Sequence, residues 1–243
     1  MKAAVTPVAV IAVLLAACRL IGAEPGNDRA GSTVPQGEQR INQLTWYSEQ
    51  GKVNGVEIIF PEVIPYPEGN NRIPREVFEN RRQILSARFA PGDIYSASLP
   101  REDRRDSLTV SFRLEVAVGD RPDEGSRLNI AGIEFGFLYL SQLDQPVRPV
   151  QLCVRSLDED GDPFWEVLPI TMLAHPVNGV PVTSLPMQLK LDRDAETYEV
   201  LSMTGVPIRG LGARKWTAAA APISIILDLS DVSAPATMSD LQF

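Results

Sequence analysis

Alternating aspartates are the densest group of side chains in this sequence that could bind a metal. Asp158, Asp160 and Asp162 bring together carboxylate oxygens, the ligands that Ca²⁺ prefers. A helix–loop–helix calcium site needs glycine at its sixth position and a bidentate glutamate at its twelfth, but Pro163 and Pro169 stand there. Two interpretations stay open: a hairpin turn between two strands, and a calcium site of another kind that more distant ligands complete.

Glu134 is the candidate for acid–base catalysis. It lies in the apolar segment Ile-Glu-Phe-Gly-Phe at positions 133–137. A carboxylate-dependent glycosidase needs two Asp or Glu side chains across a cleft, and the sequence around Glu134 offers no evident partner. Strand alternation gives the other interpretation, in which Glu134 faces solvent on the side opposite Ile133 and Phe135.

Tryptophan supplies the candidate ligand-binding surface. Exposed aromatic rings pack against the apolar face of a sugar while polar neighbours bond its hydroxyls. Trp165 lies in an expected strand, and Trp216 follows Arg214 and Lys215 in a segment of loop-like composition. Both tryptophans are therefore predicted to contact a glycan. Burial in the core is the alternative for each, because Trp is highly buried on average.

Other function classes lack the residues that they need. His175 is the only histidine, no Gly-x-Ser-x-Gly motif accompanies it, and catalytic zinc normally takes several His or Cys ligands. No phosphate-binding loop motif is present. The net charge is −8 at pH 7 and the sequence has no basic block, so no nucleic-acid partner is expected.

The first residues have the pattern of an export signal. Lys2 precedes a short apolar run that ends in Leu-Ala-Ala-Cys at positions 15–18. This ending resembles the lipobox of bacterial lipoproteins, which implies lipidation of Cys18 and attachment to a membrane. Cleavage after Ala23 by an ordinary signal peptidase is the alternative. The protein is thus expected to be exported, either as a membrane-anchored lipoprotein of the cell envelope or in secreted or periplasmic form.

Composition divides the chain into three parts. Residues 1–23 form the signal, residues 24–43 form a flexible tether rich in polar residues, glycine and proline, and residues 44–243 form a single domain. Within the domain, residues 108–118 place apolar side chains at every second position, which is typical of a half-buried strand. Similar strand signals recur at residues 56–60, 84–89, 128–140, 150–157, 164–170, 187–191, 197–203, 223–229 and 238–243.

These runs, with Gly, Pro, Asn and Asp between them, predict an all-β fold. We expect a single antiparallel β-sandwich of the jelly-roll type with about ten strands. At most one short helix is expected, over residues 74–85. Cys153 is the only cysteine besides Cys18, so no disulfide is expected within the domain and its core must stabilise it.

The C-terminal quarter resembles concanavalin A-like sandwich domains, including the laminin-G-like modules of exported bacterial proteins. Residues 187–192 and 196–200 resemble the hairpin of that family, in which an Asp-rich turn joins two strands. Residues 239–243 resemble its last strand, which returns beside the first. The resemblance implies a jelly-roll-like sandwich, and none of the family's ligand-binding residues can be transferred to this chain.

Three functions remain as hypotheses. The first is an exported, non-catalytic β-sandwich that binds an extracellular or envelope glycan through Trp165 and Trp216. The second is a structural or assembly lipoprotein of the envelope whose partner is another protein. The third is a glycan-active enzyme that uses carboxylates such as Glu134. No cofactor is required by any of them, and calcium is the one metal that the aspartate loop would take.

Overall fold

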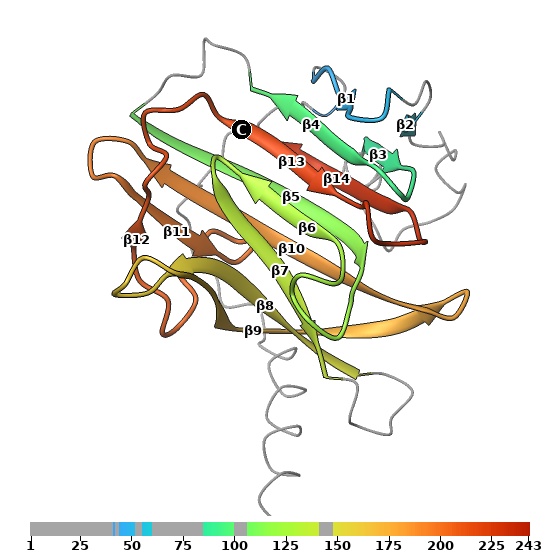
Figure 1. Cartoon of the computed structure of the whole chain (residues 1–243). Helices are drawn as coiled ribbons and strands as arrows, with labels where there is room; N and C mark the ends of the chain where they lie inside the picture. The colour runs from blue at the N-terminus through green and yellow to red at the C-terminus, as the bar shows by residue number, and fades with distance from the viewer. Residues whose placement is uncertain (1–40, 42–43, 52–54, 60–84, 100–105, 141–147) are drawn as a thin grey trace, which may run out of the picture. The chain divides into compact units, whose positions relative to one another are not determined.

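The computed structural model describes residues 41, 44–51, 55–59, 85–99, 106–140 and 148–243, all of which fall within the unit of residues 37–243 (Figure 1). The expected signal, almost all of the tether and all of the expected helix except Leu85 lie outside these residues, as does Cys18. Within the described part of the chain, no helix is long and apolar enough to cross a membrane.

The described residues form fourteen β-strands, and they confirm the all-β prediction. The strands are β1 (Tyr47–Ser48), β2 (Val56–Ile59), β3 (Ser86–Phe89), β4 (Ile94–Ser98), β5 (Ser107–Ala117), β6 (Arg127–Ile130), β7 (Ile133–Tyr139), β8 (Arg148–Leu157), β9 (Pro163–Val177), β10 (Val180–Asp192), β11 (Thr197–Leu201), β12 (Arg214–Lys215), β13 (Ser224–Asp228) and β14 (Ala236–Gln242).

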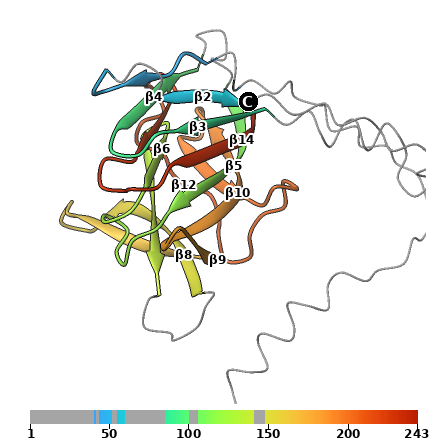
Figure 2. The same ribbon diagram turned by 90° about the vertical axis from the view of Figure 1, so that its right-hand side faces the viewer.

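All of these strands belong to one antiparallel sheet. Its order is β1-β4-β13-β6-β7-β8-β9-β10-β5-β14-β3-β2, and β11 pairs with both β10 and β12 beside this path. Figure 2 shows the sheet curling, with β8 and β9 at one level and β2, β3 and β14 at another. The curl makes a single antiparallel β-sandwich, because one face of the sheet is turned inward along most of its length and encloses the core.

The sheet folds over where β9 and β10 separate. These two strands pair only near their shared turn, from Val180 with Val177 to Thr183 with Ala174. Beyond that point β9 continues beside β8, whereas β10 continues beside β5. On the side that β9 has left, β10 pairs with β11 instead. The two halves of the sheet therefore diverge from one hairpin.

Strict alternation in β5 fills the core, as the sequence predicted. Leu108, Val110, Phe112, Leu114 and Val116 are all nearly or fully buried. Burying each of these side chains contributes about 1.5–3 kcal/mol relative to leaving it exposed. The facing half of the sheet supplies matching apolar side chains, so a single hydrophobic cluster spans both halves.

The prediction of one strand over residues 128–140 was wrong. The chain turns back at Ala131 and Gly132, whose φ angles are +56° and +82°, and separates β6 from β7. Two successive positive φ angles are typical of the tight turn that joins antiparallel strands. The side-chain oxygen of Asn129 accepts a hydrogen bond from the Gly132 amide at 3.0 Å and stabilises this turn.

Three other sequence expectations need correction. Strand β9 continues past Ile170 to Val177 through a register shift opposite Gln151 and Cys153. The short strands β1, β4 and β12 were not predicted. The C-terminal strand β14 pairs with β5 and β3 rather than with the first strand.

Cys153 lies on the outward face of β8 and is nevertheless fully buried. Its neighbour on β7 is Gly136, where a Cβ atom would lie 2.7 Å from the carbonyl oxygen of Pro122. The absence of a side chain at Gly136 lets the segment between β5 and β6 lie against the sheet here. Burial raises the pKa of the Cys153 thiol to about 11.

We expect Cys153 to react slowly with thiol reagents in the folded protein. In the Cys18→Ser variant Cys153 is the only thiol, and its raised pKa leaves about one hundredth of the usual thiolate at pH 8. Ellman's reagent should therefore react at least about a hundredfold more slowly in buffer than in concentrated urea. Equal rates in the two solvents would contradict the burial of this side chain.

Candidate functional site

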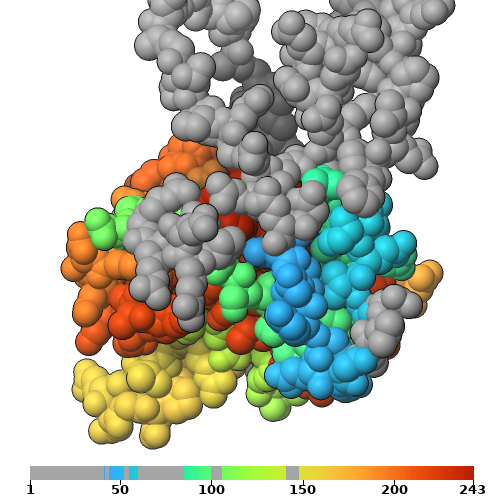
Figure 3. Space-filling view, turned by 90° about the horizontal axis from the view of Figure 1, so that it is seen from above, coloured from blue at the N-terminus to red at the C-terminus, as the bar shows by residue number. Residues whose placement is uncertain are grey.

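A groove of about 650 Å³ opens where β7 begins, β8 ends, β9 begins and β12 lies opposite them. Figure 3 shows the yellow residues of the β8–β9 turn beside the orange-red segment that contains β12. The walls combine polar and apolar side chains. The lining includes Ile133, Glu134, Arg155, Ser156, Leu157, Tyr198, Arg214 and Lys215.

An ion pair between Glu166 and Arg214 links β9 to β12 beside this groove. Two guanidinium nitrogens of Arg214 donate to the two carboxylate oxygens of Glu166, at 2.5 and 2.7 Å. The Ser156 hydroxyl donates to the same carboxylate at 3.4 Å. The hydrogen bonds and charge of Arg214 hold the pKa of Glu166 below its usual value. This pair thus connects the two halves of the sheet where β9 and β10 have separated.

Tyr198, on β11, lines the groove beside Arg214 and is buried. Burial raises the pKa of its hydroxyl, while the nearby guanidinium acts in the opposite direction. The Nε atom of Arg214 is buried and has no hydrogen-bond partner among the described residues. Ion pairing and burial therefore hold Arg214 in place as part of the wall.

Trp216 does not offer its ring to solvent, and the expectation of an exposed ligand-binding side chain is corrected here. It is 2 % exposed, and its indole nitrogen donates to the carbonyl oxygen of Ala131 at 2.8 Å. The guanidinium of Arg193 lies 5.4 Å from its ring centre. The ring of Trp216 packs into the core, and only part of the residue touches the groove. Its hydrogen bond to Ala131 fixes the β6–β7 turn to the segment after β12.

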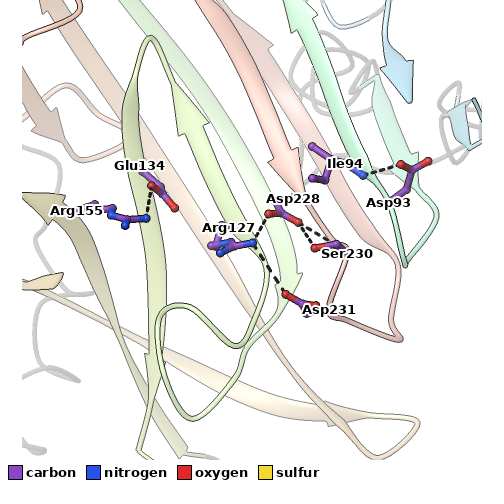
Figure 4. Close-up of polar contacts among 8 residues, drawn as sticks. All are labelled: Asp93, Ile94, Arg127, Glu134, Arg155, Asp228, Ser230 and Asp231. Atoms are coloured by element: carbon purple, nitrogen blue, oxygen red, sulfur yellow. Dashed lines mark hydrogen bonds and ion pairs between the residues drawn. The ribbon is translucent and has the colours of Figure 1, made fainter. Parts of the chain in front are cut away.

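Trp165 is half-buried on β9 and belongs to a row of four side chains on the outer face of the sheet. The backbone register aligns Asn129 on β6 with Glu134 on β7, and Arg155 on β8 with Trp165. Glu134 and Arg155 lie one residue beyond the Phe135–Val154 pair, and their side chains form an ion pair at 3.2 Å (Figure 4). We call these four residues the cross-strand row.

The guanidinium of Arg155 also lies 5.9 Å from the ring centre of Trp165. Arg155 thus connects the carboxylate of Glu134 to the aromatic ring and belongs to the lining of the groove. Trp165 itself is beside the groove rather than part of its lining. Of the sequence-predicted residues, the fold brings Glu134 and Trp165 together through Arg155.

A second hollow of about 210 Å³ adjoins the groove and shares Glu134 with it. Its lining consists of Arg127, Asn129, Glu134, Ile226 and Asp228. Arg127 forms an ion pair with Asp228 in Figure 4. Burial raises the pKa of Asp228, but hydrogen bonds from Ser230 and the charge of Arg127 outweigh it and keep the pKa below its usual value.

The aspartate loop has the hydrogen bonds of a turn. One carboxylate oxygen of Asp158 accepts from the amide of Asp160 at 3.0 Å and from that of Asp162 at 2.8 Å. The Asp158 amide in turn donates to the Asp162 carbonyl. Among the described residues no group of three or more His, Cys, Asp or Glu side chains is arranged to hold a metal ion. The loop forms the tip of the β8–β9 hairpin.

Sequence reasoning missed the residues that connect the site: Asn129, Arg155, Glu166, Tyr198 and Arg214. Alternation along β8 could have placed Arg155 on the outer face, because it shares that face with Cys153. No local pattern indicates that Glu166 meets Arg214, since 48 positions separate them in the chain.

Comparison with known proteins assigns no family. No family model matches the chain, and no curated protein matches it. Two solved structures show a distant likeness. One is a protein of unknown function, SO2946 from Shewanella oneidensis MR-1, at 8% identity over 100% of this chain and 97% of that chain, with a TM-score of 0.28. The other is the CBM2 module of the evolved Dit of Lactobacillus casei BL23 phage J-1, at 10% identity over 82% and 98%, with a TM-score of 0.23. TM-scores this low carry no argument about the fold or the function.

The Glu166–Arg214 pair should make stability depend on acid. Glu166 is charged in the folded state below its ordinary pKa of 4.5, so its stabilisation is complete above that pH and is lost as the pH falls through the lowered pKa. Its side chain is 37% exposed, and solvent screening limits the effect to about 1 kcal/mol. Urea unfolding should show Glu166→Gln less stable than wild type by this amount at pH 7, with the difference shrinking below about pH 4.

Glu199→Gln is the matched control. Glu199 is about as exposed as Glu166, but it pairs with Lys190 through one contact of 3.8 Å instead of two short hydrogen bonds, so its loss should change the free energy of unfolding by only a few tenths of a kcal/mol. A Glu166→Gln difference that stayed constant from pH 7 to pH 3 would argue against the ion pair as the cause.

Proposed function

We propose that this protein is an exported, non-catalytic glycan-binding protein and that the groove, together with the cross-strand row, is its binding surface. The observation that carries the proposal is the alignment of Glu134, Arg155 and Trp165 on three adjacent strands at the rim of the groove. Glu134 can accept hydrogen bonds from sugar hydroxyls, and the guanidinium of Arg155 can donate to them. The ring of Trp165 can pack against the apolar face of the same sugar.

The hydrogen-bonding capacity of this surface supports a polar ligand. Glu134 receives one hydrogen bond from Arg155 through its Oε2 atom, which leaves Oε1 without a partner among the described residues. Arg155 uses one of its five N–H groups for that bond. Both side chains are partly exposed, so their remaining groups are accessible to a ligand.

A role in binding suits these residues better than a role in catalysis. Glu134 is the one carboxylate among the described residues that line the groove, whereas glycoside hydrolysis uses two. Glu166 beside the groove has a lowered pKa because Arg214 stabilises its charged form. Asp228 in the adjoining hollow also has a lowered pKa, because hydrogen bonds from Ser230 and the charge of Arg127 outweigh the effect of burial. A general acid needs the opposite shift.

Export and anchoring complete the proposal. Cys18 lies outside the described residues, so lipidation of this cysteine rests on the sequence around it. A tether between a lipid anchor and the sandwich would leave the groove free to meet a glycan of the envelope or the surroundings.

Binding to a polysaccharide panel tests the proposal. We expect the protein to be retained by at least one of insoluble cellulose, xylan, chitin or peptidoglycan, and Trp165→Ala to weaken binding about tenfold, which corresponds to about 1.4 kcal/mol. Tyr47→Ala is the matched control, because Tyr47 is 64% exposed and lies on β1, the edge strand of the sheet away from the groove. Absence of retention on every polymer, or equal losses in both variants, would refute the proposed site.

A second function has its own observation. Four of the eight large hydrophobic side chains that are exposed in the described residues lie on the outer face at the end of β8 and along β9: Leu157, Val167, Leu173 and Val177. Such clustering is typical of a surface that contacts another protein. An assembly role, in which β9 contacts an envelope protein, is therefore the alternative function.

Leu173→Ser separates this alternative from glycan binding. The immobilised protein is exposed to an envelope extract of the cells that produce it, and a partner bound by β9 should be lost in Leu173→Ser. Leu173 is 64% exposed, so the substitution should leave the fold intact. Val206→Ser, at a comparably exposed apolar residue outside β9, should retain the partner. Identical protein patterns for the two variants would remove this alternative.

A further inference from the structure

We infer that the ligand is an extended glycan chain that lies across the strands and occupies both the groove and the second hollow, rather than a single terminal sugar. This inference rests on the proposed function. It is carried by Glu134, which lines both hollows, so the groove at the open end of the sheet and the second hollow on its outer face adjoin at this side chain.

Backbone register fixes the direction of this surface. Ile226 on β13 pairs with Asn129 on β6, Asn129 pairs with Glu134 on β7, and Arg155 on β8 pairs with Trp165 on β9. The ion pair of Glu134 with Arg155 joins the two halves of this line. Five strands therefore each place one side chain on a line perpendicular to the strands.

The line is too long for one sugar ring. Four spacings between neighbouring strands separate Ile226 from Trp165, which amounts to about 19 Å. Its two ends are apolar and its middle is polar. A ligand that contacts both ends must contain several sugar units in a row.

The middle of the line has unused hydrogen-bonding groups. Asn129 uses its side-chain oxygen for the Gly132 amide, and its amide nitrogen has no partner among the described residues. Oε1 of Glu134 and further N–H groups of Arg155 are unused in the same part of the chain. Neighbouring strands lie about 4.8 Å apart, so these groups form a ladder that can bond hydroxyls along a chain.

The flank of this line is closed by the segment that covers Gly136. Gly136 lies two residues along β7 from Glu134, and Pro122 packs against it. On β6, Arg127 lies two residues from Asn129 and is paired with Asp228. Pro122 and this ion pair border the line on one side, so a bound chain cannot extend along the strands in that direction.

Titration with oligosaccharides of increasing length tests the inference. The full chain is titrated calorimetrically with cello-, xylo- and chito-oligosaccharides from the monosaccharide to the hexasaccharide. In the series that binds, affinity should rise at least tenfold between the disaccharide and the hexasaccharide. Equal affinity for both lengths would overturn the extended ligand and leave the glycan-binding function standing.

Two variants in the second hollow test whether the higher affinity for longer oligosaccharides arises there. Asn129→Asp keeps the oxygen that accepts from Gly132 and removes the amide donors, and Ile226→Ala removes the apolar end of the line. Each should lower hexasaccharide affinity about fivefold and leave disaccharide affinity at the Trp165 end unchanged. Equal losses for both lengths, or no loss for either, would overturn the inference, with circular dichroism confirming that each variant is folded.

Failure of the proposed function can be distinguished from failure of the extended-ligand inference. If no oligosaccharide of any length binds and no polysaccharide retains the protein, glycan binding itself is refuted. If the disaccharide binds and Trp165→Ala abolishes that binding while length has no effect, only the extended ligand is refuted.

Discussion

The separation of β9 from β10 after the Ala174–Thr183 pair determines how this protein is built. A single sheet of fourteen strands would leave a large apolar face exposed if it stayed open. When β9 continues beside β8 and β10 continues beside β5, the two halves enclose that face between them, and residues such as Phe112 and Phe135 become fully buried. The hydrophobic effect therefore favours the separation, at the cost of hydrogen bonds that β9 and β10 no longer make to each other.

Other elements compensate for that loss. Strand β11 supplies the backbone groups that β10 needs from Gln188 to Asp192, and β12 extends the same hairpin. Arg214 on β12 then reaches Glu166 on β9, so a bidentate ion pair joins β9 to the β11–β12 hairpin that pairs with β10 in its place. The groove lies at this junction because the two halves of the sheet meet there at their open end. The separation of β9 from β10 thus accounts for both the architecture and the position of the candidate site.

The site combines residues that differ greatly in how far sequence could predict them. Glu134 and Trp165 were recognisable by type, and alternation correctly placed Glu134 opposite Ile133 and Phe135. Trp216 was equally recognisable, yet its indole donates to Ala131 inside the core. Its burial depends on a turn 85 positions earlier in the chain, and no local pattern reports such a contact. The interpretation of the aspartate loop as a hairpin turn agrees with the structure, since Asp158 accepts hydrogen bonds from within the same loop.

The sequence by itself determined the all-β class, most strand positions and the inward face of strands such as β5, because side-chain alternation is a local property of an extended backbone. Tertiary structure alone decided which strands became neighbours. The register that aligns Asn129, Glu134, Arg155 and Trp165 arises from pairing between residues up to 21 positions apart, and one residue of slippage would turn these side chains to the other face. That dependence on non-local pairing is the physical reason why Glu134 and Trp165 could be named from sequence, whereas Asn129, Arg155 and the surface that all four share could not.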